Sequence, residues 1–223
     1  MYRKEDSRHY LLIACVLVAQ LLIVVLNPSR VDGHLNPLFL ETGPIETLSP
    51  LGYGLCMVLI VALGGIRFAF TRAFSLMVVL LAMLLRELDF HTRFTAMSVT
   101  KRDFFLSGEV ALFEKLLAFF VLALISVAVL HVIATYGRPF VERLRRFDPV
   151  GIAAALSMAM VMSSLVLDGG GRSLARIGFP VSAESGNFLE KVEETLEMGI
   201  PIFAALAILA YFSGRMKGVN REV

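Results

Sequence analysis

Tryptophan is absent from this chain of 223 residues, cysteine occurs only twice, and charged residues make up only 18% of it. The two cysteines, Cys15 and Cys56, lie inside apolar runs and form no CxxC or metal-finger spacing. The sequence therefore indicates buried thiols rather than a disulfide scaffold or a zinc finger. Without tryptophan, any aromatic belt at a membrane surface must consist of tyrosine and phenylalanine.

Internal repeats, low-complexity tracts and long linkers are also missing, and no nucleotide, haem or flavin signature occurs. A phosphate-binding loop would need the GxxxxGK[ST] pattern leading into a helix, and the chain has none. We therefore expect one domain, residues 1–223, without an organic cofactor.

What the chain has in excess is apolar residues. They account for 57% of the sequence, and the mean hydropathy is +0.75, whereas a soluble domain has an apolar share of about 45–50%. A soluble fold of this length has no interior large enough for such an excess, but a bilayer can accommodate it in helices of roughly 20 residues each. The sequence predicts an all-α, polytopic integral membrane protein, a bundle of about six transmembrane helices. The expected spans are 10–26, 50–66, 73–91, 111–136, 150–168 and 194–212.

Six spans place both termini on the same side, and the charges indicate which side it is. The N-terminus, the second and fourth connections and the C-terminal tail hold 12 Lys/Arg against 5 Asp/Glu, and the remainder holds 9 against 14. Basic residues beside span ends stay in the cytoplasm, so both termini are predicted to be cytoplasmic. The expected location is the inner (plasma) membrane of a bacterium, and the lipid bilayer is the expected partner. Nucleic acid is not an expected partner, because the basic residues follow the topology rule.

The third span combines a short apolar run with charged residues. Only 13 residues, 73–85, are apolar, which at about 1.5 Å per residue covers roughly 20 Å of a hydrocarbon core of about 30 Å. The helix is therefore predicted to continue through Glu87, Asp89 and His91, which would place them at membrane depth in the outer half. Glu87 and His91 are four residues apart and so share a helix face.

Counting residues along the other spans in the same way places carboxylates of several spans in one layer near the outer surface. We name this layer the acidic rim. Glu194 and Glu197 lie on one face of the last span, and the remaining acids lie near the outer ends of other spans. The candidate metal ligands are Glu87, His91, Glu194 and Glu197, and the other rim acids are Glu46, Asp89, Glu114 and Asp168.

Two interpretations of the rim remain open. Carboxylates and an imidazole within spans can coordinate a divalent metal, relay protons, or act as an acid and a base. Alternatively, basic residues of the same layer neutralise the acids and hold the helix ends together. These are Arg86, Arg93, Lys115, Arg172, Arg176 and Lys191.

The sequence favours a membrane-embedded interaction or assembly protein in which the rim joins the helices. Its expected protein partner is another membrane protein or a second copy of this chain. The first alternative is a small cation- or proton-coupled carrier or channel. The second is a lipid-directed enzyme working at the outer leaflet. Whether the chain is an enzyme at all is left open by the sequence.

Overall fold

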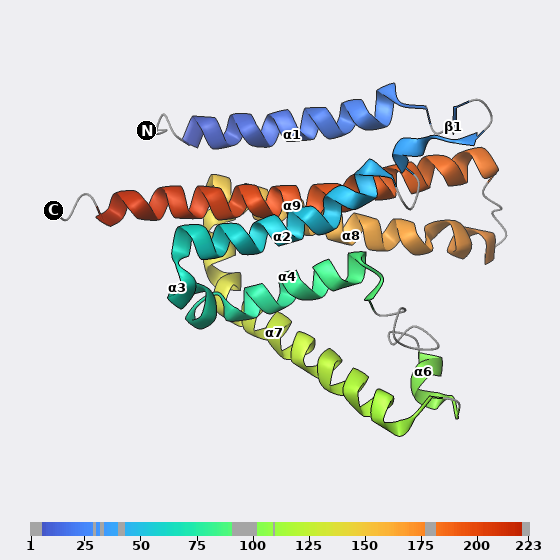
Figure 1. Ribbon diagram of the computed structural model, residues 1–223. Helices are drawn as coiled ribbons and strands as arrows, with labels where there is room; N and C mark the ends of the chain where they lie inside the picture. Colours follow the sequence, from blue (N-terminus) through green and yellow to red (C-terminus); the bar gives the residue numbers. More distant parts are fainter. Residues whose placement is uncertain are drawn as a thin grey trace.

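The computed structural model is almost entirely helical (Figure 1), which confirms the predicted all-α class. It describes residues 6–28, 30–31, 34–39, 43–90, 102–108, 110–176 and 182–219. A two-residue antiparallel pair, β1 with β2, is the other regular structure in these ranges. The elements are α1 (Asp6–Leu26), β1 (Arg30–Val31), β2 (His34–Leu35), the 3-10 helix η1 (Pro37–Phe39), α2 (Pro44–Gly64), α3 (Ile66–Thr71), α4 (Phe74–Glu87), α6 (Arg102–Leu106), α7 (Leu112–Arg145), α8 (Pro149–Arg176) and α9 (Ala183–Val219).

The helices end where the backbone can no longer continue a right-handed helix. α2 is followed by Gly65 at φ +80°, whose amide still donates to the Val61 carbonyl at 2.8 Å. α4 is followed by Asp89 at φ +51°; aspartate is one of the few residue types other than glycine that adopts this region readily. At the turn between α7 and α8, the Asp148 carboxylate accepts the amide of Val150 at 2.9 Å and so caps α8.

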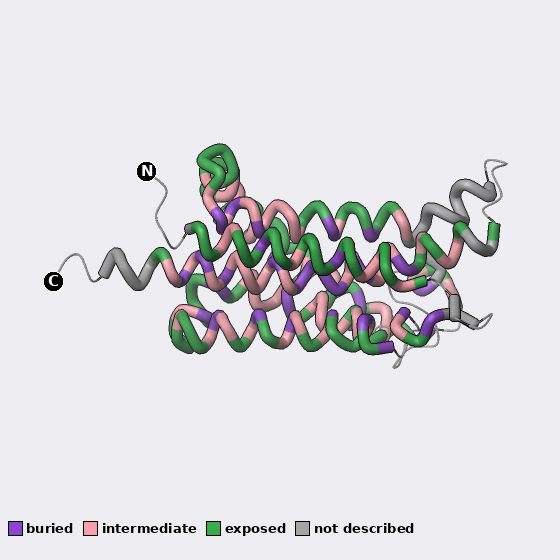
Figure 2. Tube along the Cα trace, turned by 90° about the horizontal axis from the view of Figure 1, so that it is seen from above, coloured by how far each residue is buried: buried purple, intermediate pink, exposed green. Residues whose placement is uncertain are grey.

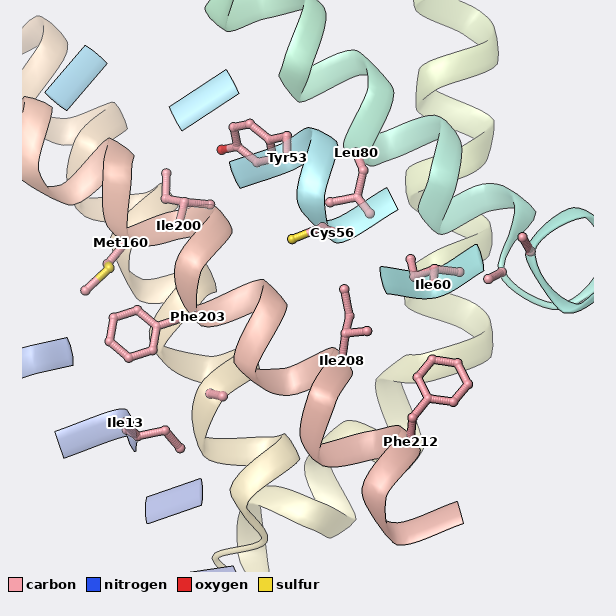
Figure 3. Close-up of a cluster of buried hydrophobic side chains, with 13 residues drawn as sticks. Ile13, Tyr53, Cys56, Ile60, Leu80, Met160, Ile200, Phe203, Ile208 and Phe212 are labelled. Carbon is pink, nitrogen blue, oxygen red and sulfur yellow. The ribbon is translucent and has the colours of Figure 1, made fainter. Parts of the chain in front are cut away.

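Helix α9 is the centre of the bundle, because α8, α2 and α1 all pack against it. Figure 2 shows the buried residues gathered on the faces that these helices turn toward one another. In the main core, Phe203 of α9 and Cys56 of α2 are fully buried and Ile60 is nearly so (Figure 3). The thiol of Cys56 donates to the Pro201 carbonyl at 3.3 Å, so this cysteine is a packing residue, as the sequence predicts.

Two glycines allow the closest approaches to α9. A β-carbon at Gly52 would lie 2.8 Å from the ring of Pro201, so α2 and α9 touch there through glycine and proline. A β-carbon at Gly199 would lie 2.2 Å from the amide nitrogen of Gln20 and 2.5 Å from the sulfur of Met160. These positions set the spacing of α2, α1 and α8 around the turn of α9 that leads into Pro201.

Five helices of the described residues are long and apolar enough to cross a membrane: α1, α2, α7, α8 and α9. The third predicted span differs from expectation, because α4 ends at Glu87 and does not continue to residue 91. The positive φ of Asp89 accounts for this earlier end. With 14 residues, α4 is about 21 Å long. It nevertheless includes Glu87, two residues beyond the apolar run.

The other helices mostly exceed the predicted span limits. α2 begins six residues earlier than expected, α7 continues through Pro139 to Arg145, and α9 extends in both directions beyond residues 194–212. The reason is that hydropathy marks the part of a helix that is apolar, whereas hydrogen bonding continues the helix into polar sequence. α1 begins and α9 ends at the same end of the bundle, beside α3 (Figure 1).

Helix α7 packs differently from the others. It contacts α4 and α8, but only Ala118 and Ala128 are buried along its 34 residues. Its largest apolar side chains are open to the surroundings, as with Phe113 at 74% exposed. Figure 1 shows α7 leaving the bundle at an angle and reaching α6 at its far end.

Candidate functional site

Glu197 is the residue through which three helices meet at the end of the bundle opposite α3. Its Oε1 accepts a hydrogen bond from Nη2 of Arg86 on α4 at 3.1 Å, and another from Oγ of Ser164 on α8 at 2.7 Å. The side chain of Glu197 is 16% exposed and that of Arg86 is 42% exposed. A carboxylate that accepts two donors, one of them charged, is strongly held, so Glu197 joins α4, α8 and α9.

Three further carboxylates interact electrostatically with Glu197 or with one another. The electrostatic interactions of Glu87 on α4 are strongest with Glu197, Arg86 and Glu46. Those of Glu194 on α9 are strongest with Glu197 and Glu46. We name Glu46, Glu87, Glu194 and Glu197 the acidic cluster. Its members come from α2, α4 and α9, three helices that are distant in the sequence and adjacent in the bundle.

Two basic side chains near the cluster have different roles. Arg86 pairs with Glu197. Lys191, which the sequence offers as a partner for the acids, is used elsewhere. Its buried amino group donates to the Val24 carbonyl at 2.8 Å and to the Asn27 carbonyl at 3.0 Å. Lys191 thus caps the C-terminal end of α1, where the helix dipole favours a cation.

Tyr53 adds a buried hydroxyl to the same region. The residue is 2% exposed, and its hydroxyl has no hydrogen-bond partner among the described residues. Its strongest electrostatic interactions are with Glu87, Arg86 and Glu197, so Tyr53 lies near the cluster on α2. A buried polar group without a partner costs about 1–3 kcal/mol, and a bound cation or water at this position would remove that cost.

The structure brings part of the predicted rim together. Glu46, Glu87, Glu194 and Glu197 are linked by electrostatic interactions, and Asp89 interacts with Glu87. Glu114 lies in the first turn of α7 and is not among the strongest partners of Glu87 or Glu194. His91 and the side chain of Asp168 lie outside the described residues.

No three His, Cys, Asp or Glu side chains of the described residues are grouped closely enough to hold a metal ion. Because His91 is outside those residues, this does not decide the predicted four-ligand metal site. It does mean that Glu87, Glu194 and Glu197 are not by themselves arranged as a three-carboxylate metal centre.

Sequence reasoning missed two members of the site. Ser164 lies within an apolar span, and nothing in its neighbourhood distinguishes it from a serine that packs between helices. Tyr53 is an unremarkable aromatic in a transmembrane run. The spacing of residues could have pointed to Tyr53, because Glu46 and Tyr53 are seven residues apart and therefore lie on one face of α2.

Comparison of the chain with protein-family models, with curated proteins and with solved structures gave no match.

Proposed function

We propose that this chain is a multi-pass integral membrane protein with six crossings, α4 being the short one, and with both termini in the cytoplasm. Five long apolar helices support the membrane assignment. An even number of crossings agrees with the start of α1 and the end of α9 lying at one end of the bundle (Figure 1). The excess of basic residues at that end favours the cytoplasm, and a bacterial inner membrane is the proposed location.

For function, the proposal is a small cation- or proton-coupled carrier, with the acidic cluster as its binding site. The observation that supports it is the set of electrostatic interactions among carboxylates near Tyr53. In the described residues, Glu87 interacts with Glu197 and Glu46, Glu194 interacts with all three, and Arg86 pairs with Glu197. Like charges repel more strongly where the surroundings are less polar than water. The cluster therefore gains free energy by taking up positive charge.

Coupling to transport follows from where the cluster lies. Its carboxylates are on α2, α4 and α9, and Glu197 also ties α4 to α8 through Arg86 and Ser164. Arg86 and an incoming cation would compete for Glu197. Binding would then weaken the contact between α4 and α9, and this changes how the helices pack at the outer end.

A role as a membrane-embedded assembly protein is the second candidate, favoured by the same Arg86–Glu197–Ser164 contacts and by α7. An ion pair that joins two helices and a serine from a third is what a purely structural rim requires. The exposed apolar sides of α7 would give a partner helix room to pack. In that case the protein should not respond to cations.

The experiment that separates the two candidates is a thermal unfolding assay of the detergent-solubilised protein with a thiol-reactive dye. Cys56 is fully buried and reports unfolding, and a Cys15→Ser background removes the exposed thiol. We expect a saturable rise in Tm with a cation or with acidification. At a hundredfold excess over the Kd, the ligand contributes about 2.7 kcal/mol, or about 5–10 °C for a chain of this size.

Glu87→Gln should abolish that rise. Glu142→Gln is the matched control, because Glu142 is an exposed acid of α7 that pairs with Arg138, and this variant should keep it. Proton release on cation addition, followed with a pH-sensitive dye, gives a second readout. If the protein responds neither to cations nor to pH, or if both variants respond equally, the assembly role is the better proposal.

A further inference from the structure

The short helix α3 lies at the corner between α2 and α4, at the end of the bundle where α1 begins and α9 ends (Figure 1). It is far along the chain from any acid, because residues 47–86 contain neither aspartate nor glutamate. Within this stretch, Arg67 lies in α3 and Arg72 directly follows it. The corner is therefore basic, at the opposite end of the bundle from the acidic cluster.

Contacts with α2 and α9 fix which side of α3 faces the bundle. The ring of Phe68 stands edge-to-face against the ring of Phe212 on α9, with 5.4 Å between the centroids. Ala69 is buried beside it. A β-carbon at Gly64 of α2 would lie 2.6 Å from the Phe68 ring, so glycine is what allows this close approach. α3 cannot rotate about its own axis without losing these contacts.

The opposite side of α3 is apolar and exposed. Ile66 and Phe70 are four residues apart and share a helix face, and they are 68% and 64% exposed. Phe74, at the start of α4, adds another exposed ring. Arg67 follows Ile66 and lies about 100° around the helix from it, so its guanidinium borders the apolar side. Apolar residues flanked by basic ones are typical of a helix that lies in a membrane surface.

Tyrosines mark the level of this end of the bundle. The hydroxyl of Tyr136 on α7 donates to the Arg72 carbonyl at 2.7 Å, directly at the end of α3. The hydroxyl of Tyr10 on α1 donates to the Phe147 carbonyl at the same end. In membrane proteins, tyrosines gather at the level of the lipid headgroups. α3 and its arginines therefore lie where headgroup phosphates are.

The arginines of this end differ in whether a protein acid neutralises them. Arg138 and Arg143 of α7 pair with Glu142 and Asp148. The two arginines of the corner are exposed and have no acidic partner among the described residues. A guanidinium presents a planar fork of N–H donors that matches a phosphate, often with two parallel hydrogen bonds. The corner thus offers phosphate donors that the protein itself does not use.

We propose that α3 is a binding site for an anionic phospholipid. Arg67 and Arg72 bind the headgroup phosphate, while Ile66, Phe70 and Phe74 pack against the acyl chains. Charge and apolar surface both favour this occupant, since an acidic segment of a partner protein would match the arginines alone. The cytoplasmic leaflet, which the proposed topology places at this end, is the one with the negative surface. This inference is separate from the carrier function and rests only on the proposed membrane assignment.

The absence of tryptophan allows a direct test, because Phe70→Trp introduces a single indole at the proposed site. The full-length variant is reconstituted in phosphatidylcholine vesicles that contain brominated phosphatidylcholine or brominated phosphatidylglycerol, whose bromine atoms quench an indole on contact. We expect the anionic lipid to occupy this position about five times more strongly at low salt. High salt should reduce this preference by screening.

Phe120→Trp on α7 is the matched reporter, because Phe120 is exposed to a similar degree, 66%. It lies in the apolar part of α7, away from the corner. Both brominated lipids should quench this indole, and their preference ratio should be close to one. The comparison separates a local site from a general attraction of the protein for anionic vesicles.

The arginines are tested in the Phe70→Trp background. Arg67→Gln together with Arg72→Gln should bring the preference for the anionic lipid close to one, whereas lysine at both positions should retain most of it, because the charge remains. Arg138→Gln is the control for loss of an arginine, and it should leave the preference unchanged since Arg138 pairs with Glu142. If the double glutamine variant does not fold, the salt dependence and the Phe120→Trp comparison decide.

Three results would overturn the inference. The first is equal quenching of the Phe70→Trp indole by the two lipids, and the second is a preference that persists in the double glutamine variant. The third is quenching at position 120 without quenching at position 70, which means that water or a protein partner covers α3 while the membrane assignment stands. Quenching at neither position removes the membrane assignment as well.

Discussion

The two ends of the bundle hold their acidic side chains in different ways. At the end that contains α3 and the turn between α7 and α8, which is the inner end in the proposed topology, two acids pair with arginines close to them in the sequence. Arg143 pairs with Asp148 at 3.3 Å, and Arg138 pairs with Glu142 at 3.1 Å. At the proposed outer end, Arg86 on α4 pairs with Glu197 on α9, and Ser164 on α8 donates to the same carboxylate.

The two ends also differ in how far along the chain their partners lie. The inner pairs join residues four and five positions apart, whereas Arg86 and Glu197 are 111 positions apart. Tyrosine hydroxyls complete the inner end, with Tyr136 donating to the Arg72 carbonyl at 2.7 Å and Tyr10 to the Phe147 carbonyl. The hydroxyl of Tyr53 near the outer end has no such partner in the described residues. Unpartnered groups from distant segments are what a binding site contains and a helix cap does not.

The largest expected effect tests which end faces which side of the membrane. Cysteines introduced as Arg145→Cys and Ser185→Cys lie at exposed positions of the inner and outer ends. In intact cells, a membrane-impermeant maleimide should label position 185 and should reach position 145 only after permeabilisation. The effect is all or none. Labelling of position 145 in intact cells contradicts the six-crossing topology.

The next effect is the loss of the positive charge that faces the cluster. Arg86→Met should lower the free energy of unfolding by about 2–3 kcal/mol, since it removes a charged hydrogen bond and leaves the carboxylates to repel one another. Unfolding in sodium dodecyl sulfate, followed by far-UV circular dichroism, measures this. Adding Glu87→Gln to Arg86→Met should recover part of the loss, because it removes one repelling charge. A double variant less stable than Arg86→Met would show that Glu87 is held by some attraction other than that of Arg86.

The smallest effect is expected at the inner end. Arg143→Met removes the pair with Asp148 and the contact of the guanidinium with the Tyr211 ring, 5.8 Å from its centroid. Because the pair is partly exposed, the same unfolding assay should give a loss of about 1 kcal/mol. Arg138→Gln, in which an exposed i,i+4 pair is broken, should cost about 0.3–0.5 kcal/mol. If Arg143→Met costs as much as Arg86→Met, the contrast between the two ends is wrong.

Part of the site was accessible from the sequence, because depth along a helix follows from counting residues. Counting outward from the apolar runs brought Glu87, Glu194 and Glu197 to one layer, and in the structure they interact. The same method was wrong about the end of α4, since it assumed that the helix must reach the membrane surface, whereas the chain turns at Asp89. It also had no means of knowing that Lys191 caps α1.

What the sequence determined by itself is the all-helical class, the presence of several long apolar helices and the uneven distribution of charge between their connections. These properties are local, since they depend on the hydropathy and charge of consecutive residues. Only the tertiary structure decided which acids interact with one another, that Ser164 donates to Glu197, and that Tyr53 lies near them. The physical reason is that sequence spacing gives the height and the face of a residue on its own helix. Which helix that face meets depends on packing, here on the approach of Pro201 to Gly52 and on the space left at Gly199.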